Sequence, residues 1–230
     1  RRQRQMCIRD RLVIAEMKTP FSDEELERLN RYVERGGNLL IAGDAERQEV
    51  MNPVVAPFGV KFLPGRLVQS GEHVANLIVG NVTRESCDLN YMFRDMFHVY
   101  TVTMPDAVAL ECDTTKGFTA TPLLVTKNKG SWIEYKTTDF VDDKAELNPE
   151  DGEVEQANLT ALALNRKVGD KDQKIIILGD ADCISNGEIS RQRSNIIASN
   201  YSFINAMFFW LSDNEVPIDV RRQPAKDNAV

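Results

Sequence analysis

Residues 12–44 read "LVIAEMKTPFSDEELERLNRYVERGGNLLIAGD", and this stretch decides the fold class. It begins with a short apolar run that predicts a strand. Ser22 and Glu25 have the spacing of a capping box, so we expect a helix to begin after Ser22. The Gly-Gly pair at 36–37 ends that helix, because a helix C-terminus favours a left-handed residue. The apolar run at 38–44 then completes a strand–helix–strand unit with parallel strands and a right-handed crossover.

The second half of the chain contains another apolar stretch that ends in the same way. Residues 174–189 read "KIIILGDADCISNGEI", in which branched apolar residues run directly into Gly-Asp. This pattern is typical of a buried strand that ends at a site. The apolar segment 159–168 predicts the preceding strand, with the polar residues 169–173 as the connecting turn. Near the C-terminus, 199–213 predicts a helix, because its apolar side chains recur at helical spacing.

The middle of the chain changes to short apolar runs separated by Gly, Pro, Asn and Asp turn signals. We expect a helix at 46–56, interrupted by Pro53, and a helical turn within 88–97. We expect short strands at 67–70, 75–80, 98–103, 107–112, 121–126 and 131–135. These strands would be inserted into the α/β core or would lie beside it.

Together these patterns predict an α/β fold with a mostly parallel sheet flanked by helices and with additional short strands in the middle of the chain. The expected organisation is a single α/β domain over 12–222, with a strand-rich insertion at 66–140 and a linker or tail at 223–230. Residues 1–11, "RRQRQMCIRDR", differ from the rest in composition. We expect a disordered or artefactual N-terminus there, with a basic juxtamembrane arm as the functional alternative.

The overall charge and hydropathy exclude two classes of partner. The chain has 35 acidic and 28 basic residues, and its formal net charge is −7. Such a balance argues against a nucleic-acid-binding protein and against docking on anionic lipid. No apolar run reaches the roughly 20 residues that a membrane-spanning helix needs.

Residue spacing gives no reason to assign a metal or a cofactor. The four cysteines form no CxxC pair and have no neighbouring histidine pair, so no zinc site is expected; a disulfide between Cys87 and Cys112 stays open. The acidic segment 142–156 lacks EF-hand spacing and predicts a solvated loop instead of a calcium site. No dinucleotide, P-loop or zincin motif occurs.

Two stretches of the chain end alike, "LLIAGDAE" from residue 39 and "IIILGDAD" from residue 175. Each places two acids at the carboxyl end of a strand, where open parallel sheets bind ligands. The four residues of this candidate ligand crevice are Asp44, Glu46, Asp180 and Asp182. One interpretation is a carboxylate cluster for a metal or a hydroxyl-rich ligand. The other, which we favour, is a pair of Asx-type caps that need no ligand, and we assign no catalytic residue and no metal ligand.

Cys183 follows the second of these strands and is a candidate nucleophile. A thiol at a strand–helix elbow, together with a histidine and an acid, is the arrangement of amidotransferase-type hydrolases. His73 and His98 lie in no recognisable pairing motif, and no glycine-flanked nucleophile elbow surrounds the cysteine. We therefore expect a buried structural thiol.

Several segments taken together resemble a known family. They are "LVIAEMKTPFSDEELERLNRYVERGGNLLIAGD", "VVAPFGVKF", "GDADCISNGEI" and "NAMFFWLSDNEVPIDVR". They resemble the auxiliary domain of ABC-type transport systems of the gliding-motility type, a domain class similar to one in intraflagellar-transport proteins. The resemblance covers most of 12–222. It implies an α/β domain related to flavodoxin-like and amidotransferase-like folds, without their catalytic residues.

The resemblance also implies a location and partners. Such domains lie on the extracytoplasmic face of a membrane protein, here the periplasmic face of the bacterial inner membrane, next to or fused with ABC-2 permease helices. The implied partners are the permease and ATPase subunits of the same system. The link to the membrane would run through flanking segments that are not part of this sequence.

Three hypotheses about function follow. The leading one is a non-catalytic binding or scaffolding domain, whose crevice near Asp44 and Asp180 holds a ligand or a partner segment. The alternative is a hydrolase or amidotransferase-like enzyme that uses the same crevice. A purely structural interaction domain without any ligand is the third.

Overall fold

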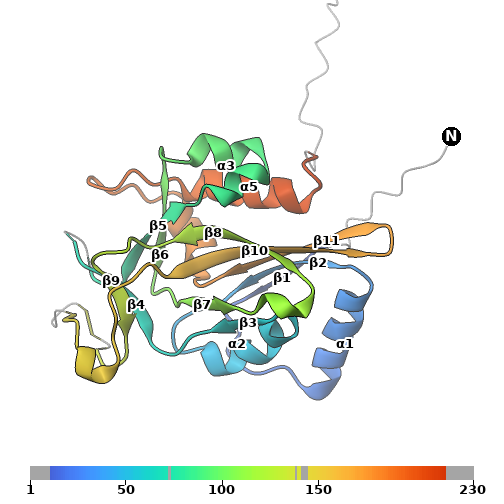
Figure 1. Ribbon diagram of the computed structural model, residues 1–230, viewed down its shortest axis with the longest axis horizontal. Coiled ribbons are helices and arrows are strands. Elements are labelled where there is room, and N and C mark those ends of the chain that lie inside the picture. The colour runs from blue at the N-terminus through green and yellow to red at the C-terminus, as the bar shows by residue number, and fades with distance from the viewer. Residues whose placement is uncertain (1–10, 72–73, 138, 141–144, 216–230) are drawn as a thin grey trace, which may run out of the picture.

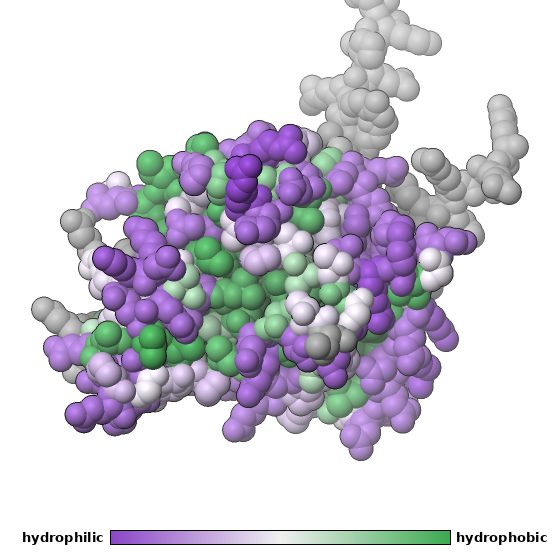
Figure 2. All heavy atoms as spheres, viewed as in Figure 1, coloured by the Kyte–Doolittle hydropathy of each residue, from purple (hydrophilic) through white to green (hydrophobic). Residues whose placement is uncertain are grey.

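The structure is a computed structural model that describes residues 11–71, 74–137, 139–140 and 145–215. A curled sheet of seven strands runs through it, with helices on both faces (Figure 1). Hydrophilic side chains cover most of the face in Figure 2 and leave an apolar area near its centre. The expectations for residues 1–10, His73 and the tail from 216 onward lie outside the described residues.

The central sheet and two small sheets contain all strands of the described residues. The central strands are β1 (Arg11–Ala15), β2 (Asn38–Ala42), β5 (Leu77–Val82), β6 (Thr101–Pro105), β8 (Thr119–Val125), β10 (Leu159–Val168) and β11 (Lys171–Leu178). The small sheets pair β3 (Val60–Phe62) with β7 (Leu110–Cys112), and β4 (Arg66–Gln69) with β9 (Ser131–Glu134). The α-helices are α1 (Asp23–Glu34), α2 (Gln48–Val55), α3 (Tyr91–Met96), α4 (Asn186–Ile189) and α5 (Asn200–Leu211).

The direction of the strands corrects the expected topology. In the order β1-β2-β11-β10-β8-β5-β6, the pairs β1–β2 and β2–β11 are parallel, and the other four pairs are antiparallel. The prediction of a mostly parallel, flavodoxin-like sheet is therefore wrong. Parallel neighbours need a long crossover, which α1 provides between β1 and β2, whereas a two-residue turn at 169–170 joins β10 to β11 and permits only an antiparallel hairpin.

Most of the expected elements are confirmed. Ser22 caps α1 with the predicted capping box, in which its N–H donates to Glu25 Oε2 at 2.8 Å. Gly36 follows the helix with a left-handed φ of 80°. All six short strands expected in the middle of the chain are present, as is the helix expected at 199–213. The helix expected at 46–56 is present as α2, but the expected interruption at Pro53 is wrong, because the helix continues through this residue to Val55. The turn expected at 169–173 is shorter, because β11 begins at Lys171.

Two apolar cores lie on opposite faces of the sheet. Leu40 and Ile176 belong to the core under α3 and α5, whereas the adjacent residues Leu39, Ile41 and Ile177 belong to the core under α1 and α2 (Figure 1). The central strands are thus buried on both faces, which explains their uninterrupted apolar sequences. Among the described residues, no helix is long and apolar enough to cross a membrane.

The start of β11 is tied to the end of α1 by one buried amide. Gln173 is fully buried, and its Nε2 donates to the carbonyl oxygens of Val33 at 2.8 Å and Gly37 at 2.9 Å. Its Oε1 accepts from Arg166 Nε at 2.7 Å. The Val33 carbonyl at the end of α1 also accepts from the Gly36 N–H at 3.0 Å, so the Gln173 amide adds a second donor there and supplies one to Gly37.

Replacing Gln173 by leucine should therefore destabilise the fold. The substitution leaves two buried carbonyls without this donor, and we expect a loss of about 2 kcal/mol in the free energy of unfolding, measured by urea titration. Asp172→Asn is the control, because this exposed neighbour forms a surface ion pair with the exposed Lys167 and should change stability by less than about 0.5 kcal/mol. Equal urea midpoints for both variants would contradict the assigned role of Gln173.

Candidate functional site

The structure places Asp44 and Asp180 on adjacent strands at the same edge of the sheet. Strands β2 and β11 are parallel, Ala42 pairs with Leu178, and Gly43 N–H donates to the Leu178 carbonyl at 2.8 Å. Asp44 and Asp180 each lie two residues beyond this pair, and the charge of Asp44 acts on the carboxyl of Asp180. The two strand ends that look alike in sequence thus meet in space.

Asp180 is a structural cap. Its side chain is fully buried, Oδ1 accepts from Asp182 N–H at 2.8 Å, and Oδ2 accepts from Cys183 N–H at 3.1 Å. Burial raises the pKa of this carboxyl well above its ordinary value, and the nearby Asp182 and Asp44 add to the rise, which the two hydrogen bonds oppose. These bonds fix the turn after β11, as the Asx-type interpretation predicts.

Asp44 is the more accessible carboxyl of the pair. Partial burial is the main cause that raises its pKa from 3.8 to about 6; a hydrogen bond from Ala45 N–H opposes the rise, and the charges of Asp106, Glu16 and Asp182 add to it. Glu16 and Asp106 follow β1 and β6, and both have a left-handed backbone, with φ of 44° and 65°. No local pattern predicts that these two acids lie near Asp44, because their strands lie far apart in the chain.

The other two predicted residues are more exposed. Asp182 is exposed after β11, and its charge acts on both Asp44 and Asp180. Glu46 is exposed with a φ of 64° and forms an ion pair of 2.8 Å with Arg66. Within the described ranges, no group of three or more His, Cys, Asp or Glu side chains is arranged to hold a metal ion.

The Cys183 side chain is part of the apolar core. Its side chain is fully buried, and its Sγ donates to the Asp180 carbonyl at 3.1 Å. Burial raises the pKa of the thiol well above its ordinary value, and nearby acids raise it further. A thiolate is the reactive species, so this environment suppresses reactivity. Cys87 and Cys112 are also free thiols, so the structure contains no disulfide between them.

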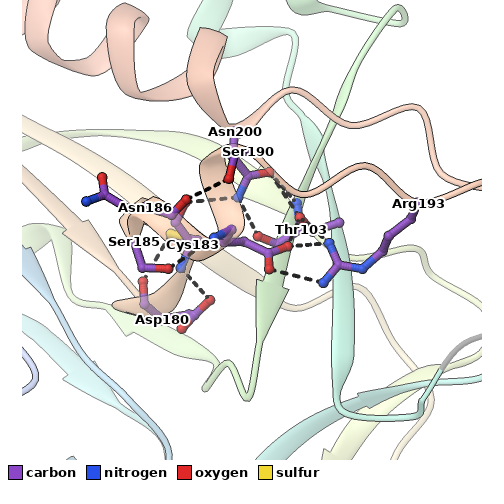
Figure 3. Close-up of polar contacts among 9 residues, drawn as sticks. Thr103, Asp180, Cys183, Ser185, Asn186, Ser190, Arg193 and Asn200 are labelled. Carbon is purple, nitrogen blue, oxygen red and sulfur yellow. Dashed lines mark hydrogen bonds and ion pairs between the residues drawn. The ribbon is translucent and has the colours of Figure 1, made fainter.

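A polar network beside this thiol was not found from the sequence (Figure 3). The carboxylate of Glu188 is buried; it accepts from Thr103 Oγ1 and forms a bidentate ion pair with Arg193, whose Nη2 lies 3.0 Å from Oε2. Asn200 Nδ2 donates to the carbonyls of Thr103 at 2.8 Å and Cys183 at 2.9 Å, and its Oδ1 accepts from Thr103 N–H at 3.0 Å. The network joins residues almost one hundred positions apart, a separation that local patterns do not reveal.

A comparison with models of protein families shows the family of this chain. The model of a family described as an ABC-type uncharacterized transport system matches residues 9–208. The chain belongs to this family. Its members form an auxiliary domain of an ABC-type transport system, which agrees with the resemblance to such a domain noted in the sequence.

Solved structures show the same fold elsewhere. The N-terminal domain of mmIFT52 is similar to this chain with 16% identity and a TM-score of 0.62, and the match covers 90% of this chain and 79% of that domain. At this identity the likeness shows the fold alone. No curated protein sequence matches the chain.

The raised pKa of Asp44 predicts a pH-dependent effect of Asp44→Asn. Between pH 3.8 and about 6 the folded protein binds more protons at this carboxyl than the unfolded chain does, so its contribution to stability falls as the pH rises through this window. The asparagine removes that loss, and because Asp44 is only partly buried we expect a gain of about 1 kcal/mol at pH 7 and little change at pH 4. Urea unfolding at both pH values measures it.

The matched control is Asp95→Asn, which alters an exposed aspartate on α3 and should give the same small change at both pH values. If Asp44→Asn were destabilising by the same amount at pH 4 and pH 7, the carboxyl would not have the raised pKa described above.

The strand end at Gly179 has no room for a side chain. A Cβ atom there would lie 2.2 Å from the Val108 carbonyl oxygen and 3.2 Å from that of Thr160, and both obstacles are backbone atoms. Gly179→Ala should therefore cost about 3 kcal/mol or more in unfolding free energy, because a backbone must move. Gly187→Ala in α4 is the control, since its Cβ meets nothing closer than 3.8 Å; a neutral result for both variants would contradict this packing.

Proposed function

We propose that this chain is a non-catalytic binding or scaffolding domain of its ABC-type transport system. The observation that carries the proposal is the state of the groups that an amidotransferase-like enzyme would use. Both oxygens of Asp180 accept backbone hydrogen bonds, and the Cys183 thiol is buried and held in its protonated form. Groups that hold the chain in place are not available to a substrate. Family membership supports the transport role.

The proposal includes a place and partners. The domain acts on the extracytoplasmic, periplasmic side of a bacterial inner membrane, beside the permease and ATPase subunits of a system of the gliding-motility type. The resemblance carried by the segments that include "GDADCISNGEI" and "NAMFFWLSDN" supports this finer assignment. The association with an ABC-type system rests on the family itself.

Cysteine labelling in cells tests the location. Lys129→Cys places a thiol on an exposed turn, in a background where Cys7 and the partly exposed Cys87 and Cys112 are changed to serine. A membrane-impermeant maleimide should label this position in intact spheroplasts. Labelling only after lysis would show that the domain faces the cytoplasm and would overturn the proposed location. Co-purification of the permease and ATPase with the native full-length protein tests the partners.

One observation favours the second candidate, a hydrolase or amidotransferase-like enzyme. A partly buried carboxyl with a pKa of about 6, as at Asp44, is suited to general acid–base catalysis near neutral pH. Hydrolysis of ester and amide substrates by the purified chain tests it, with Asp44→Asn against Asp95→Asn on α3 as the control. Turnover that only Asp44→Asn abolishes would establish the enzyme, and we expect no turnover.

A further inference from the structure

A cleft, which we call the side cleft, lies at the start of β6, whereas Asp106 of the strand-end acids follows the other end of this strand. It has a volume of about 680 Å³ and lies between the start of β6, the middle of β5 and the segment 190–199 that connects α4 to α5. In Figure 1 this segment is the orange-red loop beside β5 and β6. The volume lies within the range of ligand-binding sites, about 300–1,000 Å³.

The segment 190–199 is held firmly in position. Arg193 forms the bidentate pair with the buried Glu188, and its Nη1 also donates to Thr103 Oγ1 at 3.3 Å (Figure 3). Thr101 N–H donates to the Ile197 carbonyl at 2.9 Å, and Ser199 N–H donates to the Thr101 carbonyl at 2.9 Å. These contacts hold one wall of the side cleft in place, so the cleft exists before any partner binds.

Apolar side chains are exposed around this cleft. Ile197 is 72% exposed although its backbone is held, and Val99 and Tyr100 are 54% and 40% exposed on the wall formed by the start of β6. Exposed apolar groups that gather at one place and are rimmed by polar residues mark interaction sites. Because these three side chains line the cleft, an apolar side chain of a partner that lies in it can cover them.

The charge of the side cleft is opposite to that of the whole chain. Among the described residues its lining includes Lys127 and Arg193 and no aspartate or glutamate, whereas the chain carries a net charge of −7. Glu188 neutralises Arg193, so the positive field comes from Lys127 and from Arg191 in the adjoining hollow. A cationic site on an acidic protein attracts acidic partners selectively, since the rest of the surface repels them.

We propose that the side cleft docks a short, extended peptide segment of a partner protein, with acidic side chains near Lys127 and Arg191 and an apolar side chain against Ile197, Val99 and Tyr100. The inference deepens the proposed scaffolding function, on which it rests, by naming the chemistry of the partner. It concerns a site separate from the acids near Asp44.

Binding of synthetic copolymers to the complete chain tests the proposal. A random copolymer of glutamate and tyrosine, immobilised for biolayer interferometry, carries both features of the proposed segment. We expect it to bind, with an affinity that falls about tenfold between 50 and 300 mM NaCl because salt screens exposed charges. Polyglutamate should bind about tenfold more weakly, since it lacks the apolar contact. A copolymer of lysine and tyrosine should not bind.

Two pairs of variants locate the binding. Lys127→Glu and Ile197→Ser should each weaken binding of the glutamate–tyrosine copolymer about tenfold. Their controls are Lys171→Glu at the distant β10–β11 turn and Val13→Ser on β1, which make the same chemical changes at exposed positions and should leave binding unchanged. Unchanged urea midpoints show that the variants are folded.

Several results would overturn the inference. Equal binding of polyglutamate and the copolymer would reduce the cleft to a patch for anions, and equal weakening by the controls would show non-specific attachment. Full competition by glutarate, with no effect of Ile197→Ser, would assign the cleft to a small organic acid. If the permease and ATPase co-purify but the copolymer does not bind, the inference fails alone; if the copolymer binds but neither subunit co-purifies, the proposed function fails alone.

Discussion

The rest of the fold depends on the position of β11 (Lys171–Leu178) in the sheet. This strand pairs in parallel with β2 on one side and antiparallel with β10 on the other, and both of its faces are buried. It therefore joins the βαβ unit at one end of the sheet to the antiparallel strands from the middle of the chain. The buried amide of Gln173 anchors its start to α1, and Gly179 and Asp180 direct its end into a tight turn.

The polar groups at the end of β11 hold the turn that follows this strand. A carboxylate that is fully buried needs compensation, and Asp180 obtains it from two backbone N–H groups within three residues of its own position. The same turn places the Cys183 thiol in the core, where the charged form is disfavoured. Asp44 is only partly buried, and its pKa is raised to about 6.

A second constraint applies to β6, at the other edge of the sheet. β6 is an edge strand, and an open edge invites pairing with other chains. Asn200 bonds to both the N–H and the carbonyl of Thr103, and residues 197 and 199 bond to Thr101, so the edge is covered over half of the strand. The connection that covers it must pass over the surface, and it carries Ile197 and Arg193 with it. The segment that covers this edge also forms one wall of the side cleft.

Local signals in the sequence determined the elements but not their arrangement. The capping box at Ser22, the strand at 159–168 and the cap at Asp180 depend on residues a few positions apart, so periodicity and spacing were sufficient to predict them. Local patterns do not encode which strands become neighbours or in which direction they run, because those choices depend on contacts between distant segments. Only the tertiary structure brought Glu16 and Asp106 towards Asp44, and only it joined Thr103, Glu188, Arg193 and Asn200 into one network. The sequence by itself determined the strands, the helices and the two acidic strand ends. Packing across the sheet decided the directions of the strands and which side chains meet. Burial stabilises contacts between segments that lie far apart in the chain, and no local pattern encodes those contacts.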